Sequence, residues 1–341
     1  MALFNWLGSA GLYTAARFWS PRGVPIAAGD TGAVGKGEVV VQNRQVGATF
    51  DLGGTAAGAP PALDLMNATV AGLFMPNDLP KQPFATLSSP DQYGTVNVYG
   101  RSSVASVEVG AFQGIDRAPP PFGHGPLFAP DHLAVNLRGA AVLDASLDVK
   151  QGSMVTVTGR AVSGLNAGAS RIEGGQVVVN APLTGGAVTM THGVLYHEGY
   201  ADVGTLELGG RGEAGVSIDI DVGKLVIDKP LKFAGTLNIR AAEGNTDPAI
   251  PAVGYTGRQD VVLRGLTASS YAFDDATHRL TLWSGNAVLD TVQFSAATTS
   301  ASFRMGPYAH VDVVQTAEGV QLRGIMDNSP AGSTEIPLHT A

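Results

Sequence analysis

The sequence is short of the residues on which several common kinds of protein depend. None of its 341 residues is cysteine, which excludes a disulfide framework and a thiolate metal site. Charged residues make up only 15% of the chain, against about 25% in an average soluble domain. No apolar run reaches the length of about 18 residues that a membrane-spanning helix needs. The sequence therefore predicts no transmembrane segment.

Basic residues are also scarce. Lys and Arg together number 21 against 29 Asp and Glu, which gives a net charge of −8. A nucleic-acid-binding protein needs a basic surface, so we expect no nucleic-acid partner. The apolar N-terminal stretch carries no charge before Arg17, which makes it a poor signal peptide. An exported protein with this sequence would use another signal, or have lost its leader.

Glycine, by contrast, is abundant. The chain has 45 glycines, well above the usual share of about 7%, and they show no period of three. Glycine in such numbers is typical of a chain with many tight turns. Because 44% of the residues are hydrophobic, the chain can still form a long core. These features favour an ordered protein with many short elements.

Short segments with the pattern of β-strands follow one another between residues 134 and 240, and no amphipathic helix interrupts them. In Val142–Lys150, residues alternate between an apolar face and a polar face. The apolar face consists of Leu143, Ala145, Leu147 and Val149. Val216–Val222 and Gly235–Arg240 repeat this pattern, which indicates strands with one buried face.

These strands predict an all-β fold, and we interpret them as a β-solenoid with Pro-rich loop insertions and a C-terminal antiparallel strand set. Strand starts are irregularly spaced, so a β-sandwich or jelly roll is the alternative. We divide the chain into an N-terminal capping segment with the first rungs (1–58), a solenoid body (59–240), a C-terminal β module (241–326) and a flexible tail (327–341). Met1–Leu12 fits either a short helix or a capping strand.

Two stretches resemble a known class of protein. The first is Trp19-Ser20-Pro21, Gly23-Val24-Pro25 and Gly29-Asp30-Thr31, followed by Gly37 and a valine run. It is similar to the opening repeat of bacterial β-solenoid surface proteins of the adhesin and autotransporter-passenger class. The second, Tyr271–Phe294, is similar to a C-terminal module of large secreted adhesin-like proteins. The resemblance implies a first coil whose Trp19 packs against the end of the solenoid.

The usual catalytic motifs give no firm candidate. Gly210-x-Gly212-x-x-Gly215 matches the dinucleotide fingerprint, but a strand follows it instead of a helix. His192, His197 and Glu198 are of metal-ligand type, but an intervening glycine leaves their geometry undefined. We therefore predict no cofactor, no metal site and no enzymatic activity.

Asp219 and Asp221 are the remaining catalytic candidates. They lie two residues apart on one predicted strand face, about 7 Å from each other. Paired carboxylates of this kind act in β-helical polysaccharide lyases and hydrolases. A solvated polar strand face is the simpler interpretation of both residues.

We expect a noncatalytic extracellular protein that forms a scaffold at a bacterial cell surface or in a biofilm matrix. Its partners would be further copies of itself, joined end to end into fibres, or surface glycans. The alternatives are a polysaccharide-active enzyme and a carbohydrate-binding module that uses Tyr93, Phe122 and Phe128. The candidate interaction residues are Trp19, Phe122, His124, Phe128 and Trp283. Two loops are rich in proline, Pro76–Pro90 and 116–131, and we expect either to serve as a contact loop or simply to lie over the solenoid; the second contains Phe122, His124 and Phe128.

Overall fold

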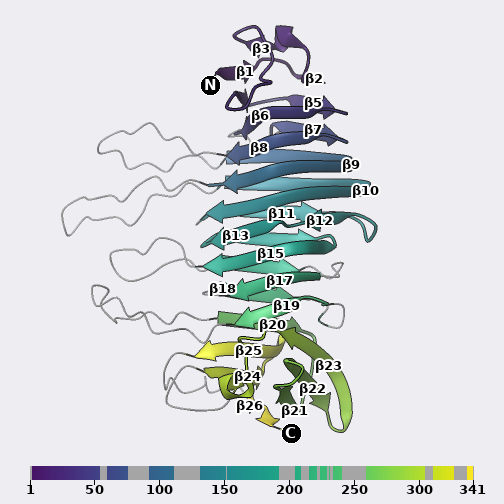
Figure 1. The fold of residues 1–341 in the computed structure, drawn as a ribbon, viewed down its shortest axis with the longest axis vertical. Helices are drawn as coiled ribbons and strands as arrows, with labels where there is room; N and C mark the ends of the chain where they lie inside the picture. The colour runs from purple at the N-terminus through teal and green to yellow at the C-terminus, as the bar shows by residue number, and fades with distance from the viewer. Residues whose placement is uncertain are drawn as a thin grey trace, which may run out of the picture.

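The computed structural model describes residues 2–53, 60–75, 92–110, 131–150, 152–191, 204–208, 215–220, 223–228, 230, 233–239, 259–303, 310–325 and 336–340. Strands dominate these residues, which contain two short 3-10 helices and no α-helix. The prediction of an all-β protein is confirmed. The strands stack into an elongated column with the two chain termini at opposite ends (Figure 1). No helix in the described part of the chain has the length and hydropathy to cross a bilayer.

The strands are numbered in chain order. Those of the first half are β1 (Leu3–Trp6), β2 (Ala10–Leu12), β3 (Trp19–Ser20), β4 (Thr31–Val34), β5 (Glu38–Gln42), β6 (Gln45–Leu52), β7 (Ala62–Met66), β8 (Thr69–Met75), β9 (Gln92–Val109), β10 (Asp131–Lys150), β11 (Met154–Thr158), β12 (Gly164–Asn166) and β13 (Ala169–Glu173). Those of the second half are β14 (Gln176–Asn180), β15 (Leu183–Thr191), β16 (Gly204–Leu208), β17 (Gly215–Ile220), β18 (Gly223–Ile227), β19 (Thr236–Ile239), β20 (Gln259–Arg264), β21 (Ser270–Asp274), β22 (Arg279–Ser284), β23 (Ala287–Phe294), β24 (His310–Gln315), β25 (Gly319–Ile325), β26 (Ile336–Pro337) and β27 (His339–Thr340).

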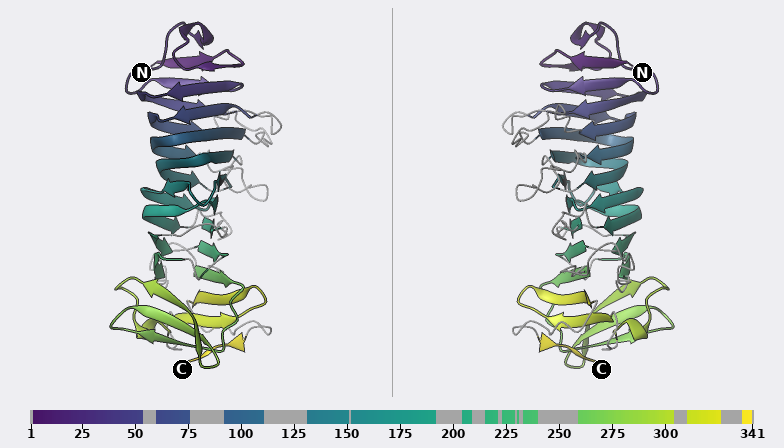
Figure 2. Two further views of the ribbon diagram at one scale, coloured as in Figure 1. Left: turned by 90° about the vertical axis from the view of Figure 1, so that its right-hand side faces the viewer. Right: turned by 90° about the vertical axis from the view of Figure 1, so that its left-hand side faces the viewer.

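Successive strands alternate between two parallel ladders. Ladder one runs through β1, β4, β6, β8, the second halves of β9 and β10, β12 with β13, β15, β17 and β19. Ladder two runs through β2, β5, β7, the first halves of β9 and β10, β11, β14, β16, β18 and β20. We call one ladder-two strand with the ladder-one strand that follows it a rung. The side views in Figure 2 show the rungs stacked along the long axis.

Register between rungs places like residues above one another inside the column. One inward position of ladder two holds a branched aliphatic side chain in nine consecutive strands, each at most 4% exposed. These residues are Val39, Leu63, Val96, Val135, Val157, Val179, Leu208, Ile227 and Leu263. Period-two alternation directs every second side chain into this interior, where burial removes apolar surface from water.

Four tight corners from ladder two to ladder one contain a residue in the left-handed region. Asn43, Asn67, Gly100 and Gly139 occupy this corner in four consecutive rungs, with φ between 47° and 68°. Glycine and asparagine adopt such values at little cost, unlike branched residues. Backbone hydrogen bonds also connect the corners. The Asn67 backbone nitrogen donates to the Tyr99 carbonyl at 3.0 Å, and the Asn43 backbone nitrogen donates to the Met66 carbonyl at 2.8 Å.

The opposite corner is where rungs differ in length. Between the end of a ladder-one strand and the start of the next ladder-two strand lie 9 residues after β6, 16 after β8 and 21 after the second half of β9. Only three residues separate Lys150 from Met154. Chain length between rungs therefore varies mainly at one edge of the column, while the strands keep their register.

Aromatic side chains fill both ends of the column. At the N-terminal end Trp19 packs edge-to-face on Trp6 with ring centroids 5.0 Å apart, and Tyr13 packs on Phe50 at 5.9 Å. At the C-terminal end the Phe303 ring lies 4.8 Å from Phe273 and 5.6 Å from Phe294. Between Leu63 and Ile239, none of the buried hydrophobic residues that the structure describes is aromatic.

Both ends also change from parallel to antiparallel pairing. β3 pairs antiparallel with β1 at the N-terminal end. At the C-terminal end, ladder two continues into β25, β24 and β26 by antiparallel pairing. Ladder one continues into β23, which begins an antiparallel meander with β22 and β21. The C-terminal antiparallel strand set thus extends both ladders.

Most strands lie where the alternation predicted them. Leu143, Ala145, Leu147 and Val149 are buried as expected. The N-terminal stretch forms strands and not the alternative short helix. Part of the segment assigned to a flexible tail is paired instead, because β27 adds to β21 and β26 adds to β24. The loop Pro76–Pro90 and residues 116–130 lie outside the described residues.

Two glycines with positive φ allow a matched test of backbone crowding. A β-carbon at Gly186 (φ 77°) would overlap the Gly168 carbonyl oxygen, whereas one at Gly139 (φ 66°) would meet no atom within 4 Å. Gly139→Ala should therefore lower the free energy of unfolding by about 1–2 kcal/mol, the cost of the left-handed backbone alone. Gly186→Ala should cost about 4 kcal/mol or more. Urea denaturation measures both, and equal losses would contradict the stacked corner geometry.

Candidate functional site: polar columns on the outer faces

The outward positions of the ladders stack in the same way as the buried ones, so polar residues remote in sequence form columns. One position of ladder one brings together ten residues, which we call the outer column: Asn5, Ala33, Asp51, Phe74, Glu108, Asp148, Arg171, Thr189, Asp219 and Asn238. Adjacent strands are about 4.8 Å apart. The outer column is therefore a candidate surface for chemistry or binding.

Ion pairs occupy the middle of the outer column. Lys150 Nζ lies 2.9 Å from Asp148 Oδ2 and 3.1 Å from Glu173 Oε2, so one ammonium bridges two carboxylates. Arg171 adds a longer contact of 3.8 Å to Glu173. The hydrogen bonds to both acids raise the pKa of Lys150 against the opposing effect of burial. Lys150 therefore stays protonated and is unsuited to act as a base.

Glu108 is the acid of this group with a perturbed pKa. Burial raises its pKa above the usual value, and the neighbouring Asp148 carboxylate raises it further, while Lys150 opposes the shift. Asp148 lies directly opposite Glu108 in the register of β9 and β10. Two acids on adjacent strands repel when both are ionised. The pair therefore favours a protonated Glu108.

A row of amides crosses the outer face of ladder two. Thr158 Oγ1 donates to Asn136 Oδ1 at 2.9 Å, Asn136 Nδ2 donates to Asn97 Oδ1 at 3.1 Å, and Asn97 Nδ2 donates to Asp64 Oδ1 at 2.8 Å. All three donors point the same way along the column and end on a carboxylate. Asp64 is only 8% exposed, so this row satisfies a buried acid. Burial and the adjacent Asp64 raise the pKa of Glu38.

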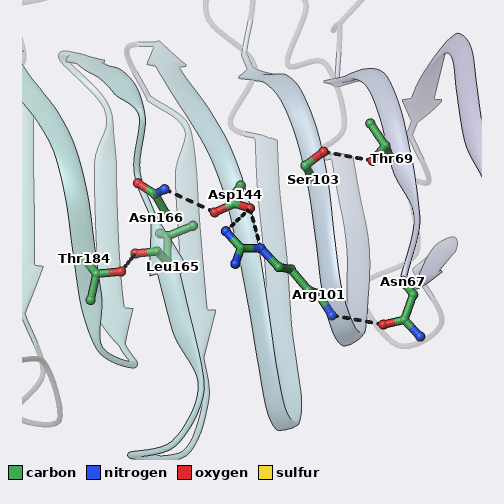
Figure 3. Close-up of polar contacts among 8 residues, drawn as sticks. All are labelled: Asn67, Thr69, Arg101, Ser103, Asp144, Leu165, Asn166 and Thr184. Atoms are coloured by element: carbon green, nitrogen blue, oxygen red, sulfur yellow. Dashed lines mark hydrogen bonds and ion pairs between the residues drawn. The ribbon is translucent and has the colours of Figure 1, made fainter.

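Figure 3 shows a further set of contacts at the start of the ladder-one strands. Asp144 accepts from Arg101 Nε at 3.2 Å and from Asn166 Nδ2 at 3.1 Å. The Arg101 backbone nitrogen in turn donates to Asn67 Oδ1 at 3.2 Å, which ties the ion pair to the corner. Both oxygens of the Asp144 carboxylate are thus engaged by protein groups.

These contacts pair the polar side chains of the outer faces with one another. No group of three metal-ligating side chains lies together in the described part of the chain. The interior holds a cavity of only about 10 Å³ between β13, β14 and β15, lined by residues such as Leu165, Ile172 and Val188. A cavity of this size holds at most one water molecule. This cavity is therefore too small for a substrate.

Of the two catalytic candidates, Asp219 lies within the described residues and Asp221 does not. Asp219 belongs to the outer column, between Thr189 on β15 and Asn238 on β19. Both neighbours are neutral, so neither supplies the acid or base that a catalytic carboxylate would need from an adjacent rung. Asp221 lies outside the described residues, as do His192, His197 and Glu198.

The candidate interaction residues have different surroundings. Trp19 is 1% exposed and its indole donates to the Tyr13 carbonyl at 2.9 Å, so it lies in the core at the column's N-terminal end. Tyr93 stacks on His132 across the outer face of ladder two, with ring centroids 4.9 Å apart. Trp283 is half-buried on β22. Phe122, His124 and Phe128 lie outside the described residues.

Glu108 and Glu173 are not among the residues that the sequence singles out. The alternation in Val142–Lys150 already places Asp148 and Lys150 on the polar face of their strand, so these two members of the group could be predicted. Their partners lie on β9 and β13, and only the register between rungs brings them together.

The chain matches no protein-family model, and comparison with curated proteins and with solved structures also yields no match.

Lys150 and Arg171 allow a test of the ion pairs. Lys150→Ala should lower the free energy of unfolding by about 2 kcal/mol, because it leaves Asp148 and Glu173 without their shared counter-charge. Arg171→Ala removes a more exposed and longer contact and should change stability by less than about 0.5 kcal/mol. Chemical denaturation at neutral pH distinguishes them. Similar losses of stability in both variants would contradict the larger contribution assigned to the Lys150 ion pairs.

Glu108 makes a pH-dependent prediction. A carboxyl whose pKa is raised in the folded state contributes stability below its unfolded pKa, and this contribution is lost as pH rises through the folded pKa. Glu108→Gln should therefore stabilise the protein at pH 7, by less than about 1 kcal/mol because solvent screens the group. At pH 4 the variant and the natural sequence should be alike. Denaturation at both pH values, with exposed Glu318→Gln as control, measures this; a stabilisation that persists at pH 4 would contradict the assignment.

Proposed function

We propose that the protein is a β-solenoid that acts as a noncatalytic scaffold and adhesive rod at a bacterial cell surface or in a biofilm matrix. The observation that carries this proposal is the continuous register of two parallel ladders over ten strands each. Every rung adds backbone hydrogen bonds and one layer of aliphatic core, and this construction favours a stiff rod. The extracellular location is an expectation from the resemblance of Trp19–Thr31 to surface proteins.

The edge at which rungs differ in length supports a display role. Residues inserted there leave the register of the strands intact, so one rod can carry connections of different length along a single edge. Binding segments are commonly placed on loops that a rigid scaffold holds in position. The buried columns would supply the scaffold, and the variable edge would supply contacts with a partner.

Three of the four ladder ends favour discrete rods over fibres, whereas β2, at the fourth, pairs only with β5 in the described part of the chain. End-to-end addition requires an open parallel edge onto which the next copy can pair. Ladder two instead ends in antiparallel β25, β24 and β26, the last of which contains Pro337 and so lacks one backbone donor. Ladder one ends at the N-terminal side in antiparallel β3. Fibre formation is therefore an alternative outcome and not part of the main proposal.

Electron microscopy of the purified protein tests the rod. Ten parallel strands span nine intervals of about 4.8 Å, so the ladders alone should measure about 43 Å in length, with the terminal strands beyond. We expect single rods of this order. Globular particles would overturn the proposal, and long filaments would replace discrete rods with end-to-end assembly.

A depolymerisation assay tests the absence of catalysis. The protein should release neither reducing nor unsaturated ends from a panel of acidic and neutral polysaccharides, and Asp219→Asn should behave identically. Turnover by the natural sequence that falls at least a hundredfold in Asp219→Asn would establish the enzyme alternative instead.

A further inference from the structure

The outer column is hollowed at its N-terminal end. A depression of about 390 Å³ lies where β1, β4 and β6 finish, lined by residues that include Asn5, Trp6, Ala33, Lys36 and Asp51. Ligand sites in proteins have volumes of about 300–1,000 Å³. The depression is therefore large enough for a small organic molecule, unlike the cavity inside the column.

The register explains the hollow. Ala33 on β4 pairs with Asn5 on β1 and with Asp51 on β6, so all three occupy the same outward position on adjacent strands. The alanine side chain is a single methyl group and leaves space between two longer polar side chains. Gly35 and Gly53, which also line the depression, add no side chain.

The lining combines two inward-facing apolar residues, Trp6 and Val34, with a polar rim. Trp6 is 3% exposed and Val34 is fully buried, and edge-to-face packing against Trp19 holds the Trp6 ring in place. Asn5, Lys36 and Asp51 supply an amide, an ammonium group and a carboxylate. A small-molecule site usually combines apolar surface with a few polar groups, and here the polar groups supply the contacts that a ligand can reach.

The rim chemistry points to a neutral polyhydroxylated ligand. Lys36 and Asp51 carry opposite charges, so an anion would meet Asp51 and a cation would meet Lys36. A hydroxyl group both donates and accepts, so adjacent hydroxyls can bond to a carboxylate, an ammonium group and an amide at once. Hydrogen bonds of this kind to charged groups are stronger than those between neutral groups.

We propose that this depression binds a short neutral saccharide, such as the end of a surface glycan. The inference rests on the proposed adhesive function and names the class of partner for it. The site lies at the end of the rod, on the same outward column as Glu108 and Asp148 but several rungs away from them. A site on the outer face near one end of the rod would leave the remaining length of the rod free of the glycan.

Saturation-transfer NMR and calorimetry with glucose, galactose, N-acetylglucosamine and cellobiose test the site. At least one of these probes should bind saturably to the full chain. Ala33→Phe, which fills the hollow, should weaken that binding by about tenfold or more. Ala134→Phe makes the same change at an outward position of ladder two and should leave binding unaltered. Lys36→Ala, at an exposed position, provides a second variant if Ala33→Phe fails to fold.

Three outcomes would overturn the proposal. They are no saturable binding of any probe, equal binding by Ala33→Phe and the natural sequence, and binding of a zwitterion such as glycine in preference to the sugars. Rods that bind none of the probes would remove the saccharide site alone. A particle that is not a rod would remove the proposed function itself.

Discussion

Parallel, in-register pairing between successive rungs is the constraint on which the rest of the structure depends. It repeats each side chain's position about every 4.8 Å. The energetic contribution of a residue therefore depends on its neighbours in the adjacent rungs as much as on its own strand. Inside, this produces continuous columns of Val, Leu and Ile such as the one through Val157. Outside, it would place like charges next to one another. Lys150 and Arg101 relieve that repulsion by pairing with Asp148 and Asp144.

Polar satisfaction follows from the same geometry. An asparagine side chain can both donate and accept, so it suits a position that repeats along the column axis. Asn97 and Asn136 do this between Thr158 and the buried Asp64. Aromatic rings, by contrast, are concentrated where the repeat stops. Trp19 and Phe303 lie at opposite ends, where the pairing becomes antiparallel.

The sequence predicted strands and faces well, because alternation is local. Leu143 and Asp148 could be assigned to opposite faces from Val142–Lys150 alone. The register between rungs could not be predicted from the sequence, because the number of residues between rungs varies at one corner and hides the repeat. The signal that survives is the left-handed corner, at Asn43, Asn67 and Gly100, which only the structure shows to be aligned. The hollow beside Ala33 depends on three strands meeting and leaves no trace in any one of them.

The stacking can be measured directly, because the chain has no cysteine and spin labels can be placed at will. Glu38, Thr156, Val178 and Glu207 share one outward position of ladder two. From Glu38, the other three lie four, five and six strand intervals away, or about 19, 24 and 29 Å. Electron–electron double resonance on the three cysteine pairs should show distances that grow by about 4.8 Å per rung. Distances that stay constant, or that change without regard to rung number, would contradict the parallel register.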